Sequence, residues 1–273
     1  MKKLKWLSLI LLVISIAYFA VYNIQAWRTK DDRGPEITME TEEILVSVTD
    51  GEEALLEGIT AMDAKDGDVT GSVVIESISD FVDANTRYVN YAAFDSDHHV
   101  SKASRKVIYT DYTPIRFSMD APLRFSVTSS GTKELLDGVH AQDCLDGDVS
   151  DNVLFSADSV INVNAAGDYA AKLMVQNSAG DEMVLPVTVT IYNTAEESVL
   201  PAVQLSQYLV YTPKGSEIDP MSYIVHEEDD QDSYSVIGSV DYNTPGVYEI
   251  QCIREDSMGH IGRVNLIVVV EEA

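Results

Sequence analysis

Beyond residue 34, apolar and polar residues alternate in short runs along the chain. Every second residue is apolar in 169–175 and again in 248–252. Side chains two residues apart share one face of an extended strand, so this period predicts strands with one buried face and one wet face. Val, Ile, Tyr and Thr dominate the runs, and Gly, Asn, Asp and Pro separate them, which is typical of strands joined by turns.

The same pattern predicts the fold class. No convincing helical stripe longer than two turns occurs after the first 27 residues. Several short strands in a short stretch of chain form a two-sheet sandwich, the smallest β unit that buries a core. We therefore expect an all-β protein made of small sandwiches, preceded by one N-terminal helix.

Internal repeats divide the chain. Residues 58–70 match residues 138–150 at seven of 13 positions, with an offset of 80 residues. A second match, between 167–180 and 246–259, keeps a Gly-x-Tyr start and a Ser-x-Gly end, and 87–96 occupies the same place in the first copy. Fixed-period self-similarity indicates repeated structural units. The predicted units are 35–111, 112–194 and a divergent third, 195–273.

The first residues have a different pattern, because 7–26 carry no charge. A helix of about 20 such residues, rising 1.5 Å per residue, matches the ~30 Å hydrocarbon layer of a bilayer. Lysines precede the run and aromatic residues flank it, which favours a cytoplasmic N-terminus. We predict a cytoplasmic segment 1–6, a transmembrane signal-anchor helix 7–27 and a linker 28–34. The localisation would be single-pass in the cell membrane, with the repeats extracellular.

A cleaved signal peptide is the alternative interpretation of this segment. Its basic start fits such a peptide, but the apolar region is long and no clean small-x-small cleavage site follows it. Both interpretations place the remainder of the chain outside the cell.

Charge narrows the possible partners. The formal net charge is −27, with 45 acidic and 18 basic residues. Such a field repels phosphate backbones, so nucleic acid is excluded as a partner, and it attracts divalent cations and basic surfaces. The two cysteines, Cys144 and Cys252, fall in different repeats and form no C-x-x-C pair, so neither a disulfide scaffold nor a structural zinc site is expected.

Together the motifs resemble a known family. Ala-x-Asp-x-x-Asp-Gly-Asp-Val followed by Thr or Ser, then Gly-x-Tyr, then Asp or Asn with Ser-x-Gly, is similar to bacterial Ig-like surface repeats. These are the type described as the Ig-like domain of a pesticidal crystal protein, related to hyalin and cadherin-like repeats. The resemblance covers 35–111 and 112–194 well, and in 195–273 it covers the Gly-x-Tyr half. It implies tandem Ig-like β-sandwiches in a surface protein, and no reaction.

The acidic loop of each full repeat is the candidate site, and two hypotheses remain open for it. In the first, Asp side chains accept backbone N–H groups in a tight turn, and glycine at positive φ completes that turn. In the second, closely spaced carboxylates supply part of the six to eight oxygens that calcium takes at about 2.3–2.6 Å. The residues concerned are Asp63, Asp66, Asp68, Asp143, Asp146 and Asp148.

No catalytic motif stands out, and we expect no enzyme: the chain has no G-x-S-x-G elbow, H-E-x-x-H pair or phosphate-binding glycine loop. The predicted function is a membrane-anchored cell-surface protein. Its repeats would act as a stalk or as an adhesive module for an unknown protein or glycan ligand. The alternatives are a partner-binding subunit of a cell-envelope assembly and a calcium-stabilised rod.

Overall fold

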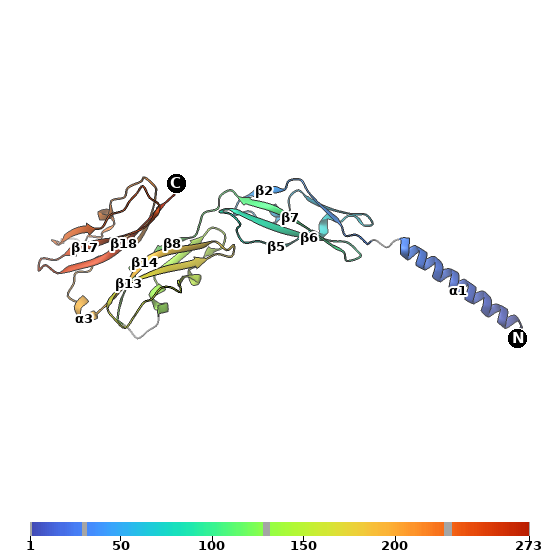
Figure 1. Cartoon of the computed structure of the whole chain (residues 1–273), viewed down its shortest axis with the longest axis horizontal. Coiled ribbons are helices and arrows are strands. Elements are labelled where there is room, and N and C mark those ends of the chain that lie inside the picture. The colour runs from blue at the N-terminus through green and yellow to red at the C-terminus, as the bar shows by residue number, and fades with distance from the viewer. Residues whose placement is uncertain (1, 29–31, 128–131, 227–230, 273) are drawn as a thin grey trace. The chain divides into compact units, whose positions relative to one another are not determined.

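The computed structural model describes residues 2–28, 32–127, 132–226 and 231–272 (Figure 1). Within these residues the chain is mostly strand, with one long helix and a few short ones. It divides into two compact units, Met1–Thr110 and Asp111–Ala273, which are described separately. Residues 29–31 of the predicted linker and 227–230 of the acidic run in the third repeat lie outside the described residues. The predicted repeat boundaries stay a prediction.

The N-terminal helix α1 is present and runs from Lys2–Arg28. A membrane crossing takes about 20 consecutive apolar residues in one helix. Across the described ranges, the structure contains no helix with the length and apolarity that a crossing requires. This finding overturns the predicted single-pass localisation with a cytoplasmic N-terminus and extracellular repeats.

The first repeat is a sandwich of two sheets. The three-stranded sheet has the order β1-β3-β4, and the four-stranded sheet has the order β2-β7-β6-β5. The strands are β1 (Glu36–Met39), β2 (Glu43–Val46), β3 (Ile59–Asp63), β4 (Gly67–Asp68), β5 (Val74–Ile78), β6 (Thr86–Phe94) and β7 (Val100–Tyr109). The short helices are α2 (Glu52–Leu56) and η1 (Thr70–Ser72).

One feature of this topology is that the chain changes sheet between β1 and β2. β1 pairs antiparallel with β3, whereas β2 pairs parallel with the last strand, β7. The first and last strands of the larger sheet therefore lie side by side, and β2 forms one edge of that sheet. Antiparallel pairing elsewhere and two face-to-face sheets make the repeat an all-β Ig-like sandwich, as predicted.

The second repeat has the same architecture. Its sheets have the orders β11-β10-β8 and β12-β13-β14-β9, and β9 pairs parallel with β14. The strands are β8 (Arg116–Met119), β9 (Arg124–Ser126), β10 (Val139–Asp143), β11 (Gly147–Asp148), β12 (Leu154–Phe155), β13 (Gly167–Gln176) and β14 (Glu182–Tyr192). The short helices are η2 (Thr132–Leu136), η3 (Ser150–Asn152) and, after β14, α3 (Thr194–Glu197).

In the third repeat the described residues form one four-stranded sheet in the order β15-β18-β17-β16. Its strands are β15 (Leu209–Pro213), β16 (Ser233–Ile237), β17 (Gly246–Glu255) and β18 (Ile261–Glu271). Near 201–205 the described residues form only an isolated bridge, between Leu205 and Ile224. The short helix η4 (Pro220–Tyr223) precedes Ile224 and has its proline in the first turn, where the missing N–H costs no intrahelical hydrogen bond.

Repeats 2 and 3 share one continuous hydrophobic core within the second unit. The β18 run from Val264 to Val270 shows why, since Leu266, Ile267 and Val268 are all buried. Consecutive buried residues in a strand require cover on both faces. One face of β18 therefore packs on the third repeat's own core, and the other packs on repeat 2.

Repeat 1 contains a buried arginine where the other repeats are apolar. Arg105 is 1% exposed, and by hairpin register the corresponding core residues are Val187 and Leu266. Both terminal nitrogens of Arg105 donate to the Glu57 carbonyl at 2.9 Å, and the Tyr91 hydroxyl donates to the Leu55 carbonyl at 2.6 Å. These carbonyls follow the last turn of α2, where a positive charge is favourable.

We expect Arg105→Leu to destabilise repeat 1 by about 1–3 kcal/mol, because the buried Glu57 carbonyl would lose its donors. Hydrogen exchange of the β6 and β7 amides in the full chain measures the change. Lys102→Leu is the control, because Lys102 lies on the same strand with an exposed side chain. Equal protection in the two variants would contradict a structural role for the guanidinium.

Candidate functional site

The acidic loops of repeats 1 and 2 fold in the same way. Asp63 Oδ1 accepts the backbone N–H groups two and three residues further on, both at 2.8 Å. Asp143 Oδ1 accepts the equivalent pair, both at 2.9 Å. Gly67 and Gly147 follow at φ +76° and +75°, which a residue with a Cβ adopts at a cost. Each loop is therefore a tight turn built on its first aspartate.

The second aspartate of each loop reaches the hairpin at the same end of the sandwich. The two oxygens of Asp66 accept the Ser96 N–H at 2.7 Å and the Ser96 hydroxyl at 2.9 Å. The two oxygens of Asp146 likewise accept the Ser178 N–H at 2.6 Å and the Ser178 hydroxyl at 2.7 Å. The Ser96 backbone and hydroxyl hydrogen bonds lower the pKa of the Asp66 carboxyl. This carboxylate thus fastens one loop to the other.

The third aspartate caps the short helix that follows. Asp68 Oδ1 accepts the Thr70 N–H at 3.0 Å, and Asp148 Oδ1 accepts the Ser150 N–H at 3.0 Å. Hydrogen bonds from the side chain and backbone of Thr70 lower the pKa of Asp68, and those from Ser150 lower the pKa of Asp148. All six predicted site residues therefore accept hydrogen bonds within their own repeat.

This geometry is what the turn hypothesis requires. Among the residues that the structure describes, no group of three or more His, Cys, Asp or Glu side chains is arranged to hold a metal ion. Whether calcium binds the loops stays a prediction.

We expect the midpoint of thermal unfolding of the full chain to be the same in calcium and in chelator. The reason is that each of the six aspartates already accepts hydrogen bonds within its own repeat through at least one oxygen, and an ion that does not bind leaves the midpoint unchanged. Magnesium at equal ionic strength is the control for general screening of the acidic surface. A rise of several degrees in the unfolding midpoint that only calcium produces would contradict this expectation and support the calcium hypothesis.

The buried end of the loop differs between the two repeats. In repeat 2, Asn177 Nδ2 donates to Asp143 Oδ2 at 3.1 Å and contacts the Tyr112 hydroxyl at 3.2 Å. The Tyr112 hydroxyl in turn donates a hydrogen bond to Asp181. Burial is the main cause that raises the pKa of Tyr112, and the hydrogen bond to Asp181 is the second. The network satisfies Asp143, which is 2% exposed. It depends on the donor at position 177.

Repeat 1 has Asp95 at the place of Asn177. Asp95 accepts the His99 N–H at 2.7 Å with one oxygen and lies 2.7 Å from His99 Nδ1 with the other. A carboxylate cannot replace the amide donor, and Asp63 Oδ2 has no hydrogen-bond partner among the described residues. Burial raises the pKa of Asp95, but the hydrogen bonds from His99 outweigh it and the net shift is downward.

Asn177→Asp should destabilise the second unit by about 1–3 kcal/mol at neutral pH, because it removes the donor to buried Asp143 and places a second carboxylate beside it. Urea unfolding of the full chain measures the loss. Asn164→Asp makes the same chemical change at an exposed loop position and serves as the control. If both variants unfold at the same urea concentration, the network does not stabilise the fold.

A second candidate site, which the sequence did not indicate, is the seam between repeats 2 and 3. Here repeat 3 side chains bind backbone N–H groups at the open edges of repeat 2 sheets. Glu249 Oε1 accepts the Thr188 N–H at 2.6 Å, beyond the end of β9, and the Tyr211 hydroxyl accepts the Phe117 N–H of edge strand β8 at 2.9 Å. The pKa of Tyr211 is raised by burial.

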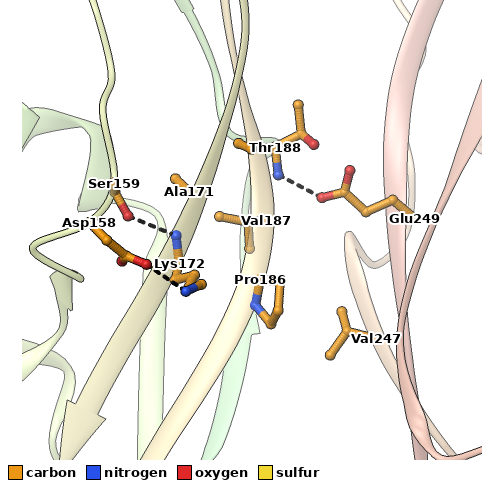
Figure 2. A pocket seen from close by; sticks show the side chains of 10 residues that line it. Asp158, Ser159, Ala171, Lys172, Pro186, Val187, Thr188, Val247 and Glu249 are labelled. Carbon is orange, nitrogen blue, oxygen red and sulfur yellow. Dashed lines mark hydrogen bonds and ion pairs between the residues drawn. The ribbon is translucent and has the colours of Figure 1, made fainter.

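A groove of about 450 Å³ opens along this seam (Figure 2). Figure 2 shows Lys172, its partner Asp158 and Pro186 on the repeat 2 side, with Val247 and Glu249 opposite. Lys172 Nζ lies 2.6 Å from Asp158 Oδ2. Opposite charges and small apolar side chains thus line one open hollow.

The sequence carried one signal for this seam. Alternation predicts one wet face per strand, yet apolar residues run without interruption from 266 to 270. Such a run indicates burial on both faces. Glu249 itself sits on an alternating strand with no motif around it, so its hydrogen bond to Thr188 could not be foreseen.

The fold and these loops define a class: an all-β protein with tandem Ig-like sandwich repeats. No family model and no curated protein matches the chain. Solved structures do match in part. The CBM51-2 and INT domains of Clostridium perfringens ZmpB, solved with GlcNAc, are 21% identical over 55% of this chain and 26% of that chain, with a TM-score of 0.23.

Two further structures are similar at the same level. A lipoprotein from Bacteroides thetaiotaomicron is 12% identical over 57% of this chain and 80% of its own, with a TM-score of 0.24. The protocadherin GammaB4 extracellular domain is 12% identical over 88% of this chain and 49% of its own, with a TM-score of 0.21. The chain spans about a quarter of the length of the ZmpB structure. At these scores the likenesses carry no argument about ligands.

Proposed function

We propose that this chain is a non-catalytic binding module, and that its ligand, a protein or a glycan, binds in the seam groove between repeats 2 and 3. The observation that carries the proposal is the groove itself. It offers an ion pair, a carboxylate from the opposite repeat and apolar side chains in one hollow of about 450 Å³. That mixture of few polar groups and apolar surface is typical of ligand sites at domain interfaces.

The construction of the groove supports this proposal. Its two walls come from repeats that share one core, so the groove keeps its shape without a ligand. A preformed site loses less conformational entropy on binding than a site assembled by the ligand. On the repeat 2 wall, Pro186 of β14 presents a ring and no N–H donor, which leaves specificity to Lys172, Asp158 and Glu249.

Catalysis is not part of the proposal. The titratable groups in the groove pair with one another or with backbone, as Lys172 does with Asp158 and Glu249 does with Thr188. Covalent catalysis requires a nucleophile with an adjacent base, and we assign the charged side chains of the groove to ligand binding instead.

The test is binding of the full chain to an array of glycans and purified surface proteins. We expect a defined ligand whose affinity falls at least about tenfold, or ~1.4 kcal/mol, in Lys172→Glu, because that change reverses the charge in the groove. Lys102→Glu is the matched control, since Lys102 is an exposed, ion-paired lysine of repeat 1. An array without any ligand, or equal loss in both variants, would refute the proposal.

A further inference from the structure

A second and smaller hollow lies on the same seam. We name it the seam cavity; its volume is about 180 Å³. Thr188 lines both hollows, so the Thr188–Glu249 hydrogen bond lies beside them. The cavity is far larger than the roughly 10–15 Å³ that one water needs. It is smaller than the ~300–1,000 Å³ typical of sites for drug-sized ligands.

The polar wall of the seam cavity is built from two cross-strand pairs. In repeat 2, Asp168 pairs with Thr190, and the Thr190 hydroxyl donates to Asp168 Oδ1 at 2.7 Å. In repeat 3, Gln251 pairs with Asn265. All four residues line the same cavity. Directly opposed residues on neighbouring strands lie close enough for one ligand to touch both.

Much of this hydrogen-bonding capacity is unused. Within the described ranges, the Gln251 amide and the Arg263 guanidinium form no hydrogen bond or ion pair. Asn265 makes one long contact, 3.4 Å to Glu249 Oε2. Each free amide offers a carbonyl acceptor and an NH₂ donor in one plane. The Gln251 side chain is partly buried and the Arg263 side chain is exposed, so both are open to solvent and available to a ligand that enters the cavity.

The remaining wall is apolar and includes an aromatic ring. Tyr208 lines the cavity and is 9% exposed, with Met119, Leu123 and Ile267 around it, all buried. The wall thus combines an aromatic body with paired amides, a hydroxyl, a carboxylate and a guanidinium. A ligand that fits must be small, must carry several groups that both donate and accept hydrogen bonds, and must have an apolar face.

We infer that the seam cavity binds a single sugar ring at the end of a glycan, a ligand class that rests on the proposed function of the seam. Neighbouring hydroxyls of a sugar ring both donate and accept hydrogen bonds, so they match the polar groups of the Gln251–Asn265 and Asp168–Thr190 pairs. The C–H face of a pyranose matches the Tyr208 side. An isolated phosphate fits less well, since Asp168 lies in the wall and the chain carries a net charge of −27.

The other arginine of the wall does not change this conclusion. Arg124 is already paired with Glu197, donates to the Arg263 carbonyl at 3.1 Å and stacks over the Tyr192 ring at 5.3 Å. Its charge is neutralised within the protein. Of the two arginines in the described wall, Arg263 is the one whose guanidinium can donate hydrogen bonds to a ligand oxygen.

The experiment is saturation-transfer NMR and calorimetry on the full chain with free glucose, galactose, mannose, N-acetylglucosamine and glucuronic acid. At least one of these sugars is expected to bind. Gln251→Ala should weaken it at least about tenfold, or ~1.4 kcal/mol. Thr190→Val, which keeps the shape of the side chain, should also weaken it. Gln176→Ala, at an exposed glutamine on β13, should bind as wild type.

The outcomes separate this inference from the proposed function. If no sugar binds, or if binding survives both Gln251→Ala and Thr190→Val in folded protein, the sugar site is refuted. Array binding that is lost in Lys172→Glu but unaffected by Gln251→Ala would refute the sugar site and leave the seam groove in place. Inorganic phosphate that binds where no sugar does, with its binding weakened in Gln251→Ala, would also overturn the inference.

Discussion

Burial of β18 on both faces is the constraint on which the second unit depends. A strand that is apolar on both faces cannot remain at the surface of a single sandwich. Repeat 3, whose described residues form one sheet, therefore covers the outer face of that sheet with repeat 2. The polar residues on that face, Glu249, Gln251 and Asn265, are placed in the seam as a consequence, and both hollows follow from their position.

The acidic loops show how one motif serves two repeats with a single difference. In both, an aspartate at the strand end builds the turn, a second fastens the hairpin serine, and a third caps a short helix. The exchange of Asn177 for Asp95 removes one donor, and repeat 1 keeps an unpartnered carboxylate oxygen at Asp63. Such an oxygen is costly when buried, so repeat 1 is held less tightly at this end than repeat 2.

Much of the fold could be predicted from local pattern, whereas the seam could not. Period-two alternation and the Gly-x-Tyr motif located the long hairpins, because strand faces and turns are fixed by neighbouring residues. Turns at Asp63 and Asp143 were one of the two hypotheses that the local sequence left open, beside calcium binding. The failures were non-local. The predicted transmembrane helix is one of them, since α1 did not meet the requirement for a membrane crossing. The Thr188–Glu249 contact joins residues 61 positions apart with no shared motif.

The parallel pairing of β2 with β7, and of β15 with β18, has a mechanical consequence. In each case the first strand of the larger sheet lies beside the last, over register partners that run in the same direction. Tension applied to the two ends of such a repeat pulls these strands past one another in shear. All hydrogen bonds of the pair then bear load together, instead of opening one after another as a zipper does.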